Sequence, residues 1–161
     1  MEAGDVPGLL AFANTLIAED TFILLSGKKI TLKEEQKYVT DGLKLMKKGK
    51  KTRFVVTISG AIIASGEIRR GELRHWHSGD LGISVLAPYR GQGVGRALME
   101  VLIAEARNMG LRMLWLNCFA NNAAALHLYK KFGFIQCGIL PEALSYKGGF
   151  VDELTMYTML T

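Results

Sequence analysis

The chain has 161 residues, of which 49% are hydrophobic and 22% charged, proportions typical of one globular domain of ordinary size. No apolar run reaches the roughly 18–20 residues of a membrane helix, and Met1 is followed by acidic rather than basic residues, so we expect neither a membrane protein nor a secreted one. The net charge of +5 favours anionic partners but does not require nucleic acid. Two cysteines, Cys118 and Cys137, lack C-x-x-C spacing and predict free thiols in the cytoplasm.

Two helices are expected before any strand. The first follows Asp5-Val6-Pro7, a helix-start pattern, and carries apolar residues at helical spacing to residue 17. The second begins with a capping box between Thr31 and Glu34. It closes in the lysine-rich segment 47–51, which we interpret as a solvated helix end.

The middle of the chain predicts an antiparallel meander. Segments 54–58 and 61–69 are strand-like and are joined by Ser59-Gly60, a hairpin turn. A third strand covers residues 80–86 and stops at Pro88, because proline cannot continue a central ladder.

The last third alternates strand and helix. Segment 111–119 is apolar on both faces, as a central strand should be, and Asn122 then caps a short helix that ends before Gly133. Segments 134–140 and 150–160 form a final pair of strands, with Pro141 in the loop between them.

The segment Arg-Gly-Gln-Gly-Val-Gly-Arg at 90–96 lies between the third strand and an amphipathic helix. Alternate glycines at a helix N-terminus leave successive backbone N–H groups accessible, which predicts an anion-binding turn. The segment lacks the Gly-Lys-Ser/Thr of a P-loop. It also fails the dinucleotide pattern G-x-G-x-x-G/A, because Arg96 or Leu98 stands where the last glycine is needed.

This turn, preceded by a strand and Ala-Pro, resembles the acyl-CoA pyrophosphate loop of the GNAT superfamily of N-acetyltransferases. A second segment, N-A-A-A-L-H-L-Y-K-K-F-G-F at 122–134, is similar to that family's N-x-x-A-x-x-L-Y-x-x-x-G-F. Segment 114–129 most resembles the branches that acetylate ribosomal-protein alanine or amino acids. The resemblance implies one α/β (α+β) domain over residues 1–161, with a mixed, mostly antiparallel twisted sheet flanked by helices and a first strand that is short or missing.

The resemblance also implies acetyl-CoA as cosubstrate and indicates which residues hold it. The cradle for the pyrophosphate corresponds to Arg90, Gly91, Gln92, Gly93, Val94, Gly95 and Arg96, and the strand edge along the pantetheine arm corresponds to Ser84, Val85 and Leu86. Asn122 corresponds to a residue that binds the arm, and Tyr129 to the tyrosine that protonates the leaving thiolate. Such a transfer is reasonable because the reference pKa values of a phenol and a thiol, about 10 and 8.5, lie close together.

The general base stays open. The ribosomal-protein branch has a glutamate after its Leu-Trp-Leu, where this chain has Asn117, and a neutral amide takes up no proton. Asp80 and Glu67 lie on neighbouring predicted strands and are the carboxylates that could act directly or through a water. His75 and His77 are further candidates, but without a third ligand they predict no metal site.

The acceptor is expected to be a primary amine: a protein N-terminus, an amino acid or a small amine. In the family the region between the first two helices lines the acceptor pocket, which makes Asp20, Thr21, Phe22 and Leu24 candidates. No motif supplies an acyl-enzyme nucleophile, so we expect direct attack in a ternary complex. The alternative, suggested by Asn117, is a catalytically weak or inactive acyl-CoA-binding sensor or scaffold. A monomer and a homodimer are both compatible with the sequence.

Overall fold

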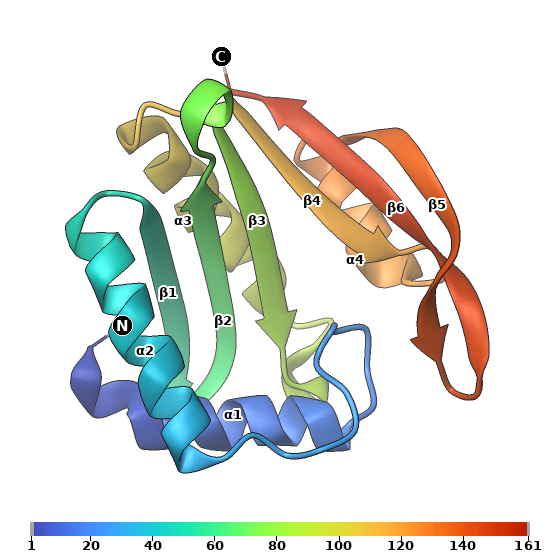
Figure 1. The fold of residues 1–161 in the computed structure, drawn as a ribbon. Helices are drawn as coiled ribbons and strands as arrows, with labels where there is room; N and C mark the ends of the chain where they lie inside the picture. The colour runs from blue at the N-terminus through green and yellow to red at the C-terminus, as the bar shows by residue number, and fades with distance from the viewer. Residues whose placement is uncertain (1, 161) are drawn as a thin grey trace.

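The structure is a computed structural model that describes residues 2–160. Within that range a mixed sheet has the strand order β1-β2-β3-β4-β6-β5, with β3 and β4 parallel and every other pair antiparallel (Figure 1). The strands are β1 Lys51–Ile58, β2 Ala61–Arg70, β3 Ser78–Val85, β4 Met113–Phe119, β5 Ile135–Tyr146 and β6 Gly149–Met159. The helices are α1 Val6–Ala18, α2 Leu32–Lys47, α3 Val94–Asn108 and α4 Ala123–Lys131, with short 3-10 turns at Ala3–Asp5, Leu73–His75 and Ala87–Tyr89. The predicted fold class is confirmed, and no strand precedes α1 among the residues described.

Helices α1 and α2 cover one face of β1 and β2 (Figure 1). The predicted capping box opens α2: the Thr31 N–H donates to the Glu34 carboxylate at 2.8 Å, and the Glu34 N–H donates to the Thr31 hydroxyl at 3.3 Å. A small apolar core joins these helices to the sheet, formed by Leu9, Phe12, Leu16, Val39 and Ile62.

Helices α3 and α4 lie on the opposite face of the sheet, where the larger core forms (Figure 1). Strand residues with alternate spacing face these helices, as expected for a sheet with one buried face. The buried strand residues of this core are Ala64, Ile68, Leu81, Leu114, Leu116, Cys118, Leu154 and Met156.

Strand β1 begins at Lys51, three residues earlier than predicted. The Lys51 side chain is only 1% exposed, and its ammonium lies 2.9 Å from the Glu67 carboxylate on β2. The interpretation of segment 47–51 as a solvated helix end is therefore wrong for Lys51, because the half-buried carboxylate of Glu67 draws this lysine into the sheet.

Strand β5 runs to Tyr146, whereas the sequence predicted a loop around Pro141. Proline is tolerated here because β5 is an edge strand and its register with β6 shifts between Leu140 and Leu144. The Glu142 N–H donates to the Asp152 carboxylate at 3.0 Å, which closes the irregular segment.

The pairing between β3 and β4 is short. Only Ser78 to Asp80 on β3 pair with Met113 to Trp115 on β4. Beyond these residues β3 remains paired with β2 and β4 with β6, so the sheet splits and leaves a V-shaped opening between β3 and β4 (Figure 1). The Leu86 N–H donates to the Ile63 carbonyl on the β2 side at 3.0 Å. Since N–H directions alternate along a strand, the amides of Ile83 and Val85 face the opening.

Two glycines of β3 lie on opposite faces of the sheet, Gly79 on the face of the large core and Gly82 on the other face. A Cβ at Gly79 would lie 2.7–3.1 Å from the buried side chains of Leu111, Ile68 and Leu114, whereas a Cβ at Gly82 would meet nothing within 4 Å. We expect Gly79→Ala to lower the free energy of unfolding by about 1–3 kcal/mol through overpacking. Gly82→Ala, the matched control, should change it by no more than about 0.5 kcal/mol, as measured by urea denaturation. Equal effects of the two substitutions would contradict this assignment of faces.

Candidate active site

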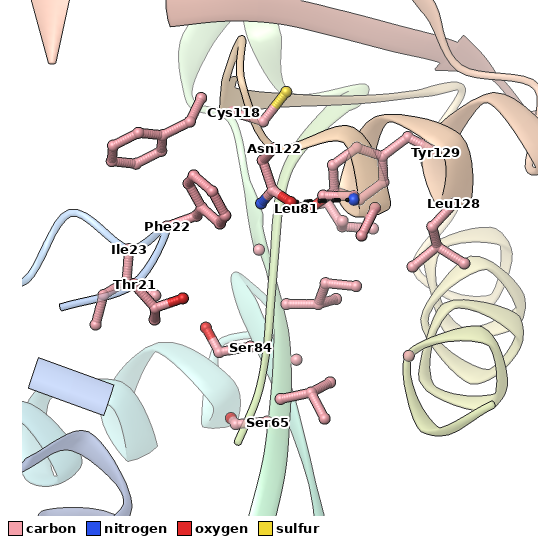
Figure 2. Close-up of a pocket in the computed structure, with 18 of the residues that line it drawn as sticks. Thr21, Phe22, Ile23, Ser65, Leu81, Ser84, Cys118, Asn122, Leu128 and Tyr129 are labelled. Carbon is pink, nitrogen blue, oxygen red and sulfur yellow. Dashed lines mark hydrogen bonds between the residues drawn. The ribbon is translucent and has the colours of Figure 1, made fainter. Parts of the chain in front are cut away.

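A cleft of about 1170 Å³ occupies the opening between β3 and β4. Its walls come from the segment after α1, the glycine turn before α3 and the start of α4, and strand residues form its floor (Figure 2). The residues predicted as site residues that line it are Glu67, Asp80, Ser84, Val85, Arg90, Gly91, Gly93, Gly95, Arg96, Asn122 and Tyr129. The topology therefore gathers most of the predicted positions around one cavity.

The glycine turn presents an open surface. Gly91 and Gly93 have φ values of 74° and 84°, the left-handed region that glycine adopts without strain. A Cβ at either position would meet no atom within 4 Å. The Ala97 N–H donates to the Gly93 carbonyl at 3.0 Å, which is the first bond of α3 and leaves the preceding N–H groups at the helix end. This geometry suits an anion such as a pyrophosphate.

Gly95 differs from the other two glycines. A Cβ there would lie 3.3 Å from Leu128 on α4, so Gly95 allows α3 and α4 to pack closely below the cleft. The third glycine of the motif thus has a packing reason as well as its place in the turn.

The two arginines of the turn are held differently. Arg90 donates to the Val85 carbonyl at 2.9 Å and forms an ion pair with Glu19, whose carboxylate also accepts from the Ala87 N–H at 2.9 Å. Arg96 makes an exposed pair with Glu100 at 3.0 Å, one helical turn away. Such exposed pairs contribute only about 0.3–0.5 kcal/mol, so Arg96 is easily redirected to a phosphate, whereas Arg90 fixes the end of β3.

Three predicted cofactor residues do not line the cleft. Leu86 packs against the small core, Val94 packs against the large core, and the Gln92 side chain donates back to the Pro88 carbonyl at 2.7 Å. Because the Leu86 N–H is already bonded, only the backbone amides of Gln92 and Val94 are left to face an anion.

Asn122 is the N-cap of α4, and Tyr129 lies within that helix (Figure 2). Asn122 caps the helix, since its Oδ1 accepts from the Ala125 N–H at 3.2 Å, and its amide nitrogen is directed away from that bond. The Tyr129 side chain packs against Phe134 with a ring separation of 5.8 Å. Tyr129 is 6% exposed, and among residues 2–160 its hydroxyl has no hydrogen-bond partner.

Burial keeps the Tyr129 hydroxyl in its protonated form. Burial raises its pKa well above the ordinary value, and the nearby Cys118 adds to the increase. The phenol therefore stays protonated at neutral and moderately alkaline pH. The raised pKa also makes it a weaker acid toward a thiolate, whose reference pKa is about 8.5, so proton donation depends on direct contact with the leaving sulfur.

The two candidate carboxylates have opposite environments. Burial would raise the pKa of Glu67, but the charge and hydrogen bond of Lys51 and the hydrogen bond of Tyr38 outweigh it and lower the pKa. The pKa of Asp80 is raised, chiefly by desolvation; Arg69 opposes this and Glu67 adds to it. Asp80 is therefore the better proton acceptor of the two.

Other candidates from the sequence are placed less centrally. Asn117 lines the cleft, where its Oδ1 accepts from the Thr155 hydroxyl at 2.9 Å. His75 and His77 lie between β2 and β3 and do not line it.

No cluster of three or more His, Cys, Asp or Glu able to hold a metal occurs in the described part of the chain. Within residues 2–160, none of the helices has the length and apolar character needed to cross a membrane.

The segment after α1 closes one side of the cleft. Thr21, Phe22 and Leu24 line it as expected for this segment, whereas Asp20 does not. Phe22 stacks on Tyr146 at 4.9 Å between ring centroids and meets Phe119 edge-on at 5.7 Å. These rings link the N-terminal segment to the β5–β6 hairpin.

Sequence reasoning missed a cluster of polar side chains on the cleft floor. Tyr38 of α2, Arg53 of β1 and Ser65 of β2 line the same cleft as Glu67. The available signal was alternation: Lys51 and Arg53 are two residues apart and so share one face of a strand. That signal was hidden because the strand was expected to start after Arg53.

The split sheet, the glycine turn and the buried tyrosine together define an α/β protein built around a cleft whose glycine turn suits an anion. The model of the Acetyltransferase (GNAT) family matches residues 19–134, and the chain belongs to that family, as its motifs predicted. Ribosomal protein bS18-alanine N-acetyltransferase of Escherichia coli K12 is 47% identical over 74 residues, which are 46% of this chain and 50% of that protein. The chain thus spans about half the length of the curated relatives it matches first.

Solved structures match nearly the whole chain. A GNAT-family acetyltransferase from Streptococcus pneumoniae has a TM-score of 0.88 at 29% identity, covering 99% of this chain and 96% of that one. A ribosomal-protein-alanine N-acetyltransferase from Brucella melitensis has a TM-score of 0.86 at 27% identity, covering 99% and 97%.

The environment of Glu67 predicts a pH-dependent stability. A carboxyl whose pKa is lowered on folding stabilises the folded state above its unfolded pKa, and this stabilisation is lost as pH falls through the lower folded value. At pH 7 we expect Glu67→Gln to lower the free energy of unfolding by about 2–3 kcal/mol, because Lys51 keeps its burial and loses its counter-charge.

The difference from wild type should shrink in acid, below about pH 4, where Glu67 itself becomes protonated. Denaturant titrations of both proteins from pH 7 to pH 3 measure this. A difference that stays constant over the whole range would contradict the assignment of an ionised, paired Glu67.

Proposed function

We propose that this protein is an N-acetyltransferase that moves the acetyl group of acetyl-CoA to a primary amine. The observation that carries the proposal is the open edge of β3, which leads from the glycine turn at one end toward the buried Tyr129. Membership of the acetyltransferase family supports the same reaction.

The residues of the cleft fit the parts of acetyl-CoA. The turn at 91–96 and the exposed Arg96 offer N–H groups and a cation to the pyrophosphate. The backbone of Ile83 and Val85 offers hydrogen bonds to the amides of the pantetheine arm, as an added strand would use them. The free amide nitrogen of Asn122 can donate to the same arm.

The chemistry needs one proton donated and one removed. Acetyl-CoA supplies the acetyl group as an activated thioester. The amine nitrogen forms a bond to the acetyl carbon while the carbon–sulfur bond breaks, and Tyr129 donates its hydroxyl proton to the departing sulfur. Asp80, acting through a water, takes the proton that the amine loses; Glu67 is less suited because Lys51 and Tyr38 already occupy it.

Direct transfer in a ternary complex needs no nucleophile from the chain. Burial, with a smaller effect of Glu153, raises the pKa of the Cys118 thiol to about 11, so the reactive thiolate is scarce at neutral pH. Cys137 is exposed and does not line the cleft.

We propose that the protein acts in the cytoplasm. Both cysteines are free thiols, which suits a reducing cytoplasm. We propose that residues 1–161 form one catalytic domain, which acts as a monomer or a homodimer. Acceptors compatible with the relatives' names are the N-terminal alanine of a ribosomal protein and free amino acids.

Tyr129→Phe tests the proposed acid. We expect kcat to fall by about a hundredfold or more, with the affinity for CoA unchanged, because only a hydroxyl without protein partners is removed. Thiol release from acetyl-CoA, measured across a panel of amines, gives kcat, and calorimetry gives the CoA affinity. The wild-type rate should show no loss below about pH 10 that is due to ionisation of Tyr129, since its pKa is raised.

Full turnover by Tyr129→Phe would remove the tyrosine from the mechanism. If wild-type protein binds CoA but no amine releases thiol, the sensor or scaffold alternative replaces the enzyme. If CoA does not bind, the interpretation of the glycine turn is wrong.

The cysteines provide an independent test of direct transfer. The double variant Cys118→Ala, Cys137→Ser should keep kcat within about threefold of wild type, because neither thiol forms a bond to the acetyl group. A loss of about a hundredfold in a variant with an unchanged unfolding transition would instead indicate an acyl-enzyme route.

A further inference from the structure

Arg53 lies on the floor of the cleft with part of its guanidinium unused. Its side chain is 11% exposed. The Nε donates to the Ser65 hydroxyl at 2.8 Å, and the guanidinium carbon lies 5.4 Å from the centre of the Tyr38 ring. The Nη1 atom is buried and has no hydrogen-bond partner, and within residues 2–160 no hydrogen bond uses Nη2.

Neighbouring carboxylates do not satisfy this group. The Glu67 oxygen that accepts from Lys51 and Tyr38, at 2.9 and 2.8 Å, lies 3.9 Å from Nη1 of Arg53, beyond hydrogen-bond distance. Glu35 is also buried. Burial raises its pKa, the charges of Arg53 and Lys51 oppose the rise, and its carboxyl group makes no hydrogen bond to either of them. Nη1 is thus ion-paired with Glu67 but makes no hydrogen bond. A buried donor without a hydrogen bond is costly, and an anion from outside the chain would remove that cost.

The unused nitrogens form one edge of the guanidinium. Two adjacent donors held in a plane match the two oxygens of a carboxylate, the fork that arginine uses for bidentate recognition. Because Nη1 is buried, a carboxylate that enters from the cleft reaches Nη2 first. The Ser65 bond and the Tyr38 ring hold the plane in place, so little side-chain freedom is lost on binding.

Arg53 also stands in line with the open part of the cleft. It pairs in register with Glu67 on β2, which pairs with Gly82 on β3, so the three residues form a row across the strands. The space over Gly82 is empty to at least 4 Å from a Cβ position. Two strand spacings separate the ends of the row, about 9–10 Å between Cα atoms, which an arginine side chain and a small ligand together can span.

We propose that the acceptor is a small amine that carries a carboxylate, as a free α-amino acid does, and that the Arg53 guanidinium binds that carboxylate. The proposal rests on the acetyl transfer proposed above and names its substrate class. With the carboxylate at Arg53, the amine lies over Gly82, beside Asp80 and facing the opening between β3 and β4. Polyamines lack the anion, and a protein N-terminus presents a neutral amide in its place.

Amino acids and their carboxamides provide the test, because they differ only in the charge that Arg53 would bind. We expect wild-type kcat/KM for thiol release to be at least about tenfold higher for free L-amino acids than for the carboxamides or for short peptides with the same first residue. This comparison needs no variant and does not depend on how a substitution folds.

Arg53→Gln should lower kcat/KM for the free acids by at least about tenfold and change that for the carboxamides by no more than about threefold, so the preference disappears. Lys50→Gln is the matched control: it removes a neighbouring cation that pairs with Glu72 outside this cleft, and it should leave the preference intact. Calorimetric binding of CoA reports whether each variant is folded.

A wild-type protein that uses carboxamides or peptides as well as free acids overturns the proposal, and so does an Arg53→Gln variant that loses both activities equally. These results leave acetyl transfer standing. Absence of thiol release with every amine, despite CoA binding, instead overturns the proposed function and this assignment with it.

Discussion

The structure depends on where the hydrogen bonding between β3 and β4 stops. Three residues of each strand pair in parallel, and beyond Asp80 and Trp115 the two strands separate. Backbone N–H and C=O groups are costly to leave without partners, so an interrupted ladder inside a sheet either holds water or receives another extended chain. The glycine turn lies directly beyond one arm of this interruption, and α4 brings Asn122 and Tyr129 to its other side. The cleft therefore lies where the hydrogen bonding of the sheet is interrupted. Which ligand it binds depends on which molecule can supply the missing hydrogen bonds.

Packing behind the sheet keeps the opening in place. Gly66 on β2 lets Leu98 and Leu102 of α3 approach the strand closely, and Gly95 lets α3 approach Leu128 of α4. On the other face, Arg90 and Glu19 join the end of β3 to the end of α1. The opening thus lies between two well-packed regions, which suits a site that must bind a long ligand without reorganising.

Short-range signals made much of the fold predictable. The capping box of α2, the glycine boundaries, the strand end before Pro88 and the two family motifs depend on residues close in sequence, and each appears where it was expected. The alternating apolar residues of β3 correctly placed one face of that strand in the core. The position of Tyr129 was predictable only through its motif, because a buried tyrosine on a helix has many other uses.

Long-range partners account for what the sequence did not predict. Lys51 is drawn into β1 by Glu67, Pro141 is accommodated by an irregular register with β6, and Arg90 is held by Glu19. Each of these depends on a residue at least ten positions away, which neither periodicity nor propensity reports. The same reason hid Arg53, which stands out because its buried Nη1 has no hydrogen-bond partner and not because of its neighbours in the sequence.

Amide hydrogen exchange by NMR, with and without CoA, tests the opening between β3 and β4 as an acyl-CoA site most directly. The account predicts that CoA slows exchange at Ile83 and Val85, whose N–H groups face the opening, and at the glycine turn. Leu86, already bonded to Ile63, should change little. Bound CoA that leaves Ile83 and Val85 unprotected, or that protects a different surface, would contradict the account.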